Sequence, residues 1–502
     1  MIPTRHRMDS IDAAWLRMDK RTNPMVINGV WVLDGRITLE QLKRLIEERF
    51  LVHERFRAVP VEEAIGGVWV EDPYFELDAH VGLIRMPANA AQAELETLCS
   101  DLASTGLDPR RPPWHFDLVP EYGAGSAVIT RIHHCYADGI ALVRVVLGMT
   151  TTTADGDPPP PEPAAEAPRA GDEFTLPWLA PLLGTATRWL GEAVAGGSGL
   201  VGAGLKRVTH PLAVLDEAKH VAGMAGEIAS ILQYTDDPAT PLRGELGARK
   251  QVAWAPPLPF DELRTVAHAL GCTVNDVLMS VIAGTLGSYL RSRGVKTDGL
   301  TLRATLPVNL RPPDEPPSLG NRFGMVYLEL PVGVTHPLKR LYAVHESMHA
   351  LKHSEQPPAA FATLAVLGSL PAMVQDLALE VLTRKSSAVI SNVPGPRAPM
   401  YLCGQRIREQ FFWVPQSGSI GLGISVLTYA GEVQFGIIAD RGLIPAPHAI
   451  VDGFAAEFER LVILTVLGAM HLRRAPQSSS ARACSTSKRS MASKGSKDAA
   501  RS

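Results

Sequence analysis

The most informative stretch of the chain is His133-His134-Cys135-Tyr136-Ala137-Asp138-Gly139, which has the pattern HHxxxDG. It follows the β-branched run 127–132 (AVITRI), which predicts a strand. The apolar run 140–147 (IALVRVVL) comes directly after it and is typical of a helix or a second strand. The pattern therefore places two histidines at the end of a strand, where a rigid scaffold can present a base to a cleft.

The two histidines are expected to have different surroundings. Neighbouring residues on a strand point to opposite faces, so His133 and His134 cannot easily share one ligand. This disfavours a metal hydrolase with a zinc site on both rings, which would need nitrogens converging at about 2.0–2.1 Å. Asp138 suits a turn, where it can accept hydrogen bonds from the backbone or an arginine. Gly139 permits close backbone approach or a positive φ.

The composition is that of a large globular protein. The chain has 502 residues, of which 46% are hydrophobic and 20% charged, and its net charge is −3. It is long enough for two or three domains and carries no nucleic-acid-binding signature. The cysteines are odd in number and scattered: Cys99, Cys135, Cys272, Cys403 and Cys484. This predicts a reduced, intracellular protein without a disulfide framework or a metal cluster, and nothing marks Cys135 as an activated nucleophile.

No segment predicts a secretion signal or a membrane span. The first nine residues contain no apolar signal region. The stretch 410–431 is uncharged and long enough to span a bilayer, but its proline, glycines and serines predict strands and turns. If the protein meets a membrane, we expect it to lie on the membrane surface.

Shifts in composition divide the chain into four parts. Residues 1–153 and 242–472 each mix helix and strand patterns and predict two α/β (α+β) units. Residues 154–241 form a Pro-rich and helical linker, and 473–502 a disordered basic tail. The helices expected in the two units are 39–50, 90–102, 259–270, 274–293 and 445–467, and the strands lie around 68–70, 127–132, 302, 326, 390, 421–426 and 432–438.

The linker and the tail each have two interpretations. The Leu-, Ala- and Trp-rich part of the linker, 174–233, is either a helical bridge between the units or an amphipathic surface that meets lipid. The tail has eight basic residues against the single acid Asp498, namely Arg473, Arg474, Arg482, Lys488, Arg489, Lys494, Lys497 and Arg501. It either keeps the protein soluble or lies on anionic lipid, where each basic residue contributes about 1 kcal/mol.

Three further segments contain candidate site residues. Thr273 and Asp276 have the spacing of a capping box, and Asn275 between them could aim its amide at a cleft from a helix N-terminus. Trp114, some twenty residues before the histidines, is either a core residue or the wall of a substrate tunnel. The segment 391–396 (SNVPGP) predicts a rigid turn after a strand.

With these segments in view, the chain resembles the bacterial wax ester synthase/acyl-CoA:diacylglycerol acyltransferase family over nearly its whole length. HHxxxDG alone is shared with chloramphenicol acetyltransferase-like enzymes, plant acyltransferases and peptide-synthetase condensation domains, so the combination of motifs carries the resemblance. The matching segments are 9–12 (DSID), 23–25 (NPM), 107–114, 133–139, 275–276 (ND), 320–321 (GN) and 391–396. Of these, 107–114 resembles the PLW segment of the family.

The resemblance implies two chloramphenicol acetyltransferase-like domains with mixed sheets, joined by a helical linker and facing each other across a tunnel. His134 would be the general base, with Asn275 stabilising the oxyanion and His133 and Gly139 completing the catalytic loop. Asp138 would pair with an arginine, for which Arg57 is the first candidate and Arg303 the second. Substrate would contact two further residues, Trp114 and Asp276.

The expected reaction moves a long-chain acyl group from acyl-CoA, a co-substrate, to diacylglycerol or a long-chain alcohol. No metal and no bound cofactor are expected, and the enzyme would be cytoplasmic and peripherally attached to the inner membrane or to lipid inclusions. Pro113 departs from the family by standing where it usually has leucine, a position that bears on the local shape of the acyl pocket. Two alternatives remain: an acyltransferase of this fold that acts on a carrier-bound polyketide or peptide substrate, and a non-catalytic lipid-binding protein.

Overall fold

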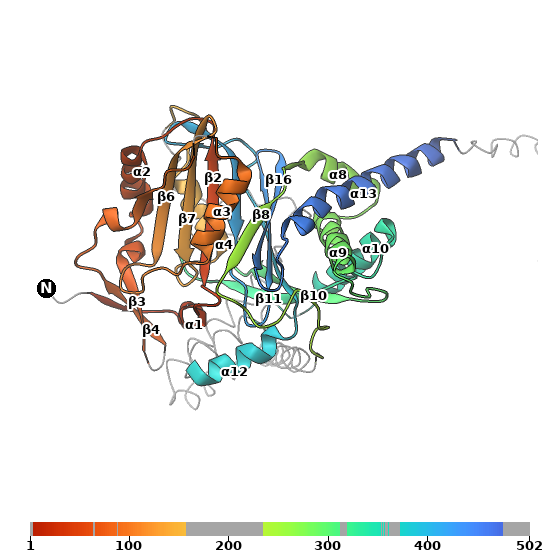
Figure 1. Ribbon diagram of the computed structural model, residues 1–502, viewed down its shortest axis with the longest axis horizontal. Coiled ribbons are helices and arrows are strands. Elements are labelled where there is room, and N and C mark those ends of the chain that lie inside the picture. Colours follow the sequence, from red (N-terminus) through yellow and green to blue (C-terminus); the bar gives the residue numbers. More distant parts are fainter. Residues whose placement is uncertain are drawn as a thin grey trace, which may run out of the picture.

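The computed structural model describes residues 4–63, 66–87, 89–156, 234–311, 319–352, 354, 356, 360 and 372–474. Two mixed α/β units lie side by side, each built around one large sheet (Figure 1). The mixed α/β class predicted from the sequence is therefore confirmed. The predicted linker and tail fall almost entirely outside the described residues.

The N-terminal unit contains a six-stranded sheet and a small three-stranded one. The six strands are, in spatial order, β13 (Tyr401–Leu402), β14 (Gln405–Trp413), β2 (Val26–Leu33), β7 (Gly125–His133), β6 (Trp114–Tyr122) and β5 (Val81–Leu83). The small sheet has the order β1 (Arg5–Arg7), β4 (Gly67–Glu71) and β3 (Ala58–Glu62). The helices of this unit are α1 (Ser10–Met18), α2 (Leu39–Leu45, extended by a π-helical turn Ile46–Phe50), α3 (Gln92–Ala103) and α4 (Gly139–Gly148).

The C-terminal unit contains a seven-stranded sheet. Its order is β11 (Phe323–Leu330), β10 (Leu302–Asn309), β12 (Ala388–Pro394), β15 (Leu422–Tyr429), β16 (Glu432–Asp440) and β8 (Lys250–Trp254), with β9 (Leu258–Pro259) also pairing with β16. The helices α8 (Phe260–Ala269), α9 (Val274–Ser292), α10 (Pro337–Lys352) and α13 (His448–Arg474) gather beside this sheet, and α12 (Ala372–Thr383) lies apart from them (Figure 1). The predicted helix 445–467 thus begins three residues later and continues to Arg474.

The C-terminal segment contributes strands to both large sheets. Strand β14 pairs antiparallel with β2 over Trp413↔Asn28 to Ile407↔Leu33 and so extends the N-terminal sheet. The predicted boundary at residue 242 does not show that β14 belongs to the N-terminal sheet. A strand pattern indicates which residues alternate between two faces, but not which distant strand they pair with.

Further contacts join the two units into one body. Buried Glu96 on α3 accepts a hydrogen bond from the backbone N–H of Trp254 on β8, and Ser100 accepts one from Val252. The main apolar cluster contains residues of both units, from Met8 to Leu461. The units therefore share a core, and this shared boundary positions the residues of the site.

Within the described ranges, no single helix is long and apolar enough to cross a membrane, while α8 and α9 meet the length and composition criteria only as a pair bent by 100°.

Candidate active site

The HHxxxDG segment lies at the end of a fully buried central strand. All nine residues of β7 are buried between β2 and β6, because apolar and β-branched side chains point to both faces. Directly after the strand, the His134 N–H donates to the carbonyl oxygen of Met25 at 2.7 Å. Helix α4 then begins at Gly139, so the run 140–147 is a helix.

The ring of His134 is held by the side chain of Asn321. The Asn321 Nδ2 group donates to Asp12 Oδ1 and to the His134 carbonyl oxygen, both at 2.8 Å. Because both amide protons are used, Asn321 Oδ1 is an acceptor, and it lies 3.0 Å from His134 Nδ1. His134 Nδ1 therefore carries the proton, and the lone pair of the neutral ring lies on Nε2.

The surroundings of His134 keep the ring neutral. Trp15 stacks on it with a centroid separation of 4.1 Å and an interplanar angle of 13°. Burial is the main influence and lowers the pKa of His134 below its usual 6.5, while the hydrogen bond to Asn321 acts in the opposite direction. A neutral imidazole with a free Nε2 lone pair is the form that accepts a proton.

Asp12 anchors Asn321 from helix α1. Its carboxylate is fully buried and accepts hydrogen bonds from Asn321 N at 3.0 Å and Asn321 Nδ2 at 2.8 Å. The second oxygen lies 3.3 Å from Arg55 Nη1. Burial raises the pKa of Asp12 to about 7, against the opposing effects of Arg55 and Asn321. The His134 ring is thus connected to helix α1 through Asn321.

His133 has separate partners and the opposite tautomer. Its Nδ1 accepts the backbone N–H of Cys135 at 3.1 Å, so its proton lies on Nε2. Burial and the neighbouring His134 lower the pKa of His133 to about 3. As expected for adjacent residues, the two rings bind different partners, and His133 fixes the loop that follows the strand.

Asp138 joins the loop to the C-terminal unit. Its Oδ1 accepts from Ala141 N at 2.9 Å and caps helix α4. Its Oδ2 forms a buried ion pair with Arg311 Nη1 at 2.6 Å and accepts the N–H of Arg322 at 2.9 Å. The predicted pairing of Asp138 with an arginine is confirmed, but the two arginines proposed for it were wrong.

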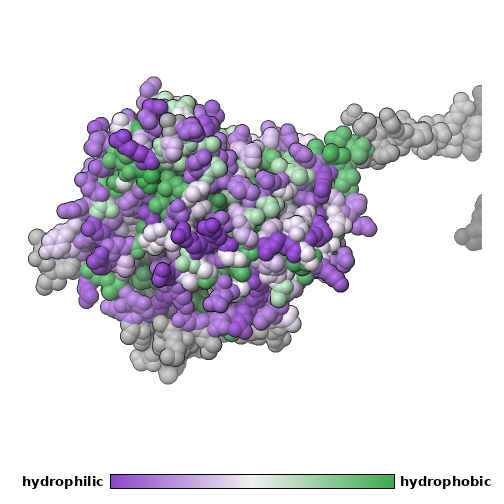
Figure 2. All heavy atoms as spheres, viewed as in Figure 1, coloured by the Kyte–Doolittle hydropathy of each residue, from purple (hydrophilic) through white to green (hydrophobic). Residues whose placement is uncertain are grey.

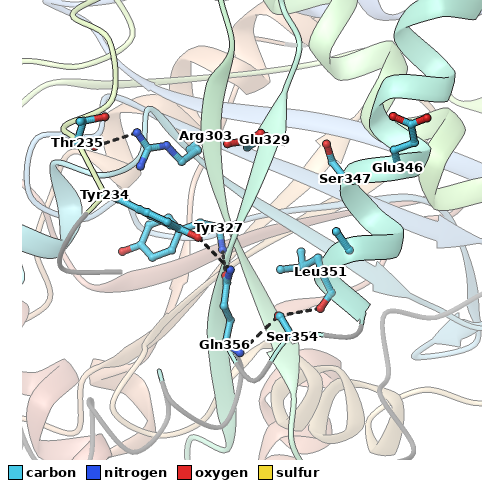
Figure 3. A pocket seen from close by; sticks show the side chains of 11 residues that line it. Tyr234, Thr235, Arg303, Tyr327, Glu329, Glu346, Ser347, Leu351, Ser354 and Gln356 are labelled. Carbon is cyan, nitrogen blue, oxygen red and sulfur yellow. Dashed lines mark hydrogen bonds between the residues drawn. The ribbon is translucent and has the colours of Figure 1, made fainter. Parts of the chain in front are cut away.

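Arg57 and Arg303 lie elsewhere. The Arg57 guanidinium lies over the ring of Phe75, 6.0 Å from its centroid. Arg303 donates to the carbonyl oxygen of Thr235 at 2.9 Å and borders a cavity of about 520 Å³ that none of the HHxxxDG residues line (Figure 3). Arg311 was missed because it reaches Asp138 across the boundary between the units, over 173 positions of sequence.

Gly320 brings the Asn321 loop against the HHxxxDG loop. Its N–H donates to the carbonyl oxygen of Tyr136 at 3.0 Å, and its own carbonyl oxygen accepts from Arg311 Nη2 at 2.6 Å. Its φ is +109°, a region that only glycine adopts readily. The glycine thus permits the turn that points Asn321 at His134.

Two family models match most of the chain. The family model described as the wax ester synthase/diacylglycerol acyltransferase catalytic domain matches residues 8–278, and the WS/DGAT C-terminal domain matches residues 319–462. The chain belongs to the wax ester synthase/diacylglycerol acyltransferase family. It is an acyltransferase, as the sequence predicted.

The relatives of this WS/DGAT protein cover most of its length. A probable diacylglycerol O-acyltransferase of Mycobacterium tuberculosis is 25% identical over 473 residues, which are 92% of this chain and 96% of that protein. A Mycobacterium bovis relative is 29% identical over 430 residues, 80% of this chain and 78% of that one. The solved wax ester synthase/diacylglycerol acyltransferase of Marinobacter aquaeolei VT8 aligns with a TM-score of 0.64 at 21% identity, over 92% of this chain and 99% of that one. That structural similarity confirms the two-domain fold.

Asn275 lies in a second polar cluster of this WS/DGAT protein. It occupies the first turn of α9, and its Oδ1 accepts from Asn392 Nδ2 at 2.6 Å. Among the described residues its Nδ2 donates no hydrogen bond. No hydrogen bond between described residues links Asn275 to His134, so their joint action belongs to the proposal below.

The other predicted site residues have mainly structural contacts. Trp114 is buried, donates from Nε1 to the Phe56 carbonyl oxygen at 2.7 Å and stacks on His80, which favours the core interpretation. Asp276 forms the predicted capping box with Thr273. Gly139 does not use a positive φ, and a Cβ built there would meet nothing within 4 Å, so its backbone faces open space.

Sequence reasoning missed five residues of the two clusters. These are Asp12, Trp15, Arg311, Asn321 and Asn392. Asp12, Asn321 and Asn392 lie in segments that carried the family resemblance (9–12, 320–321 and 391–396). The sequence therefore marked these segments but did not indicate what the three side chains do. Arg311 and Trp15 had no such signal, because their importance arises only from contacts made in the folded chain.

Proposed function

We propose that this WS/DGAT acyltransferase moves a long-chain acyl group from acyl-CoA to the hydroxyl of diacylglycerol, of a long-chain alcohol, or of both. The observation that carries the proposal is the orientation of His134, whose Nδ1–H is committed to Asn321 and whose neutral Nε2 is left as a base. The names of the relatives support diacylglycerol as acceptor.

The reaction needs a base that works twice. His134 Nε2 takes the hydroxyl proton of the alcohol while that oxygen bonds to the thioester carbonyl carbon. The tetrahedral intermediate then breaks its C–S bond, and the protonated imidazole returns the proton to the leaving sulfur. A thiolate, whose thiol has a pKa of about 8.5, leaves more readily than an alkoxide, so the intermediate breaks its C–S bond. Because the alcohol attacks the thioester directly, no covalent acyl-enzyme intermediate is needed.

The oxyanion requires a hydrogen-bond donor, and Asn275 is the proposed one. Asn392 fixes its amide with Oδ1 as acceptor, so the donor group Nδ2 has a defined direction. The amino end of α9 adds the partial positive charge of a helix N-terminus. One such preorganised donor contributes about 2.7–4 kcal/mol to the stability of the transition state.

A test compares CoA release from palmitoyl-CoA with dioleoylglycerol and with hexadecanol, each offered separately. His134→Ala is expected to lower turnover by roughly 10²–10⁴-fold. His53→Ala, a half-buried histidine outside the network, is the matched control and should keep normal rates. No turnover by folded wild-type protein with either acceptor would overturn the proposal and favour a carrier-bound substrate or a lipid-binding role.

We also propose that the enzyme works while attached to a lipid surface on the cytoplasmic side. Its acceptors are apolar and dissolve in bilayers or inclusions. Three half-exposed apolar side chains, Ile463, Val466 and Leu467, lie on one face of α13 at spacings of three and four. Figure 2 shows apolar side chains at the end of this helix, where it projects from the body. The basic residues of 473–502 follow directly and would complement anionic lipid.

Vesicle co-sedimentation tests this attachment. Each of the three side chains is about half covered already, so inserting it gains roughly 1 kcal/mol. The triple variant Ile463→Ser, Val466→Ser and Leu467→Ser should therefore bind phosphatidylglycerol vesicles about two orders of magnitude more weakly. Val52→Ser, at another exposed valine, is the control. Equal binding of the triple variant and the wild type would remove α13 from the proposal.

A further inference from the structure

A second group of reactive side chains lies where α9 begins, beside α10. Cys272 precedes the N-cap of α9, Asp276 lies in its first turn, and His345 lies on α10. Helix α10 packs against α9 (Figure 1). One potential ligand atom of each residue, a sulfur, an oxygen and a nitrogen, lies within 4.8 Å of the other two. His345 Nδ1 and Asp276 Oδ2 are 2.8 Å apart. None of the three takes part in the proposed reaction.

The Asp276 carboxylate has unused binding capacity. Its side chain is only 1% exposed, and Oδ2 accepts from both Thr273 N and His345 Nδ1. Oδ1 is also buried but has no hydrogen-bond partner among the described residues. A buried carboxylate oxygen without a partner costs free energy, which a bound cation would offset.

We propose that Cys272, Asp276 and His345 bind one divalent cation of the zinc type. Thiolate, imidazole and carboxylate together select Zn²⁺ or a similar transition metal over Mg²⁺ or Ca²⁺, which prefer oxygen alone. Three protein ligands leave a fourth tetrahedral position for water. Zinc bonds of about 2.0–2.3 Å place ligand atoms roughly 3.3–3.7 Å apart, so side-chain shifts of about 1 Å complete the geometry.

Charge and proton balance are consistent with this assignment. Thiolate and carboxylate neutralise the cation, and the amino end of α9 stabilises the thiolate. The ion binds the thiolate of Cys272, so the thiol proton passes to solvent. His345 moves its ring proton from Nδ1 to Nε2 through solvent.

Binding would fix the first turn of α9 against α10. That turn also carries Asn275, so the metal would stiffen the backbone beside the second polar cluster. The half-buried Cys272 and the partly exposed His345 leave the site open to solvent for entry of the ion. The site is separate from His134, and its existence does not depend on the acyl acceptor.

Cobalt(II) titration of the full chain tests the proposal without any activity assay. Wild-type protein should bind one Co²⁺ with a sulfur-to-cobalt charge-transfer band in the near ultraviolet, and added Zn²⁺ should abolish the band. Cys272→Ser should lose the band, and His345→Gln should bind at least tenfold more weakly. The matched control Cys403→Ser removes a half-buried thiol outside the group and should leave the titration unchanged.

Thermal unfolding provides a second measurement that also reports folding. All variants should melt cooperatively without metal, and Zn²⁺ should raise the midpoint of the wild type and of Cys403→Ser but not of Cys272→Ser. A wild type without the charge-transfer band would overturn the proposal. So would a band that persists in Cys272→Ser, or an unchanged affinity in His345→Gln.

Discussion

The interaction between Asn321 and His134 offers the sharpest test of how the site works. The change Asn321→Ala removes the Oδ1 acceptor of His134 Nδ1 and the two Nδ2 donors to Asp12 and to the His134 carbonyl oxygen. The imidazole stays in place against Trp15, but nothing then commits its proton to Nδ1. A fraction of the molecules will carry the proton on Nε2, where the ring cannot act as a base.

The expected fall in kcat follows from the hydrogen bonds that Asn321→Ala removes and from the base, His134, that it keeps. Complete loss of a general base costs roughly 10²–10⁴-fold in rate. Asn321→Ala keeps the base but removes its orientation, so we expect kcat to fall about 10–100-fold, or about 1.4–2.7 kcal/mol. Asn321 contacts other protein groups, not substrate, so KM should stay within about twofold. The loss of three buried hydrogen bonds should also lower the free energy of unfolding by about 2–4 kcal/mol.

The pH dependence of kcat distinguishes a loss of His134 orientation from a general loss of structure in Asn321→Ala. The hydrogen bond that His134 Nδ1–H donates to Asn321 Oδ1 raises the pKa of His134, against the larger lowering by burial. Without it the pKa falls further, so the acidic limb of the kcat profile, already below pH 6.5 in the wild type, should move to lower pH. Asn28→Ala removes another buried amide, from β2, and should leave kcat and its profile unchanged. Normal kcat in Asn321→Ala, or an acidic limb moved to higher pH, would show that Asn321 does not orient the base.

Three more predictions concern neighbouring groups. Arg311→Met leaves the buried Asp138 carboxylate without its cation and should cost about 3–5 kcal/mol in urea unfolding, whereas Arg57→Met should cost less than about 1 kcal/mol. The pKa of Asp12 is about 7 in the folded protein against 3.8 as reference, so its stabilising protonation is complete below about pH 4 and lost as pH rises through 7. From pH 4 to 8 the wild type should therefore lose up to about 4 kcal/mol relative to Asp12→Asn, and parallel stability curves would contradict this. Asn275→Ala should lower kcat by about 10²–10³-fold with folding intact, and an unchanged kcat would exclude it as the oxyanion donor.

Local patterns predicted most elements of the fold. Apolar periodicity placed the helices 39–50, 90–102, 259–270 and 274–293, and each forms with ends shifted by a few residues. The capping box at Thr273 and Asp276 forms as its spacing indicates. These features depend on residues within a few positions of one another, so sequence alone contains the physics that produces them.

Pairing between distant segments could not be predicted in the same way. The alternation in 405–413 does not indicate that β14 pairs with β2, almost four hundred residues earlier in the chain. The arginine that pairs with Asp138 could not be predicted for the same reason. Many arginines could neutralise Asp138, and only the docking of the Gly320 loop brings Arg311 to it. For Trp114 the sequence left a core residue and a tunnel wall as alternatives, and its hydrogen bond to Phe56 and its stacking on His80 favour the core.

The division of the site between the two units explains why the motifs are so widely spread. His134 and Asp138 come from the N-terminal unit, and Asn321 and Arg311 come from the C-terminal one. Each side is incomplete by itself: without Asn321 the base has no fixed tautomer, and without Arg311 the carboxylate that caps α4 is buried unpaired. Strand β14 adds a sheet contact between the same two units. Docking and assembly of the base are therefore one event, and a separated N-terminal unit would contain HHxxxDG without an oriented His134.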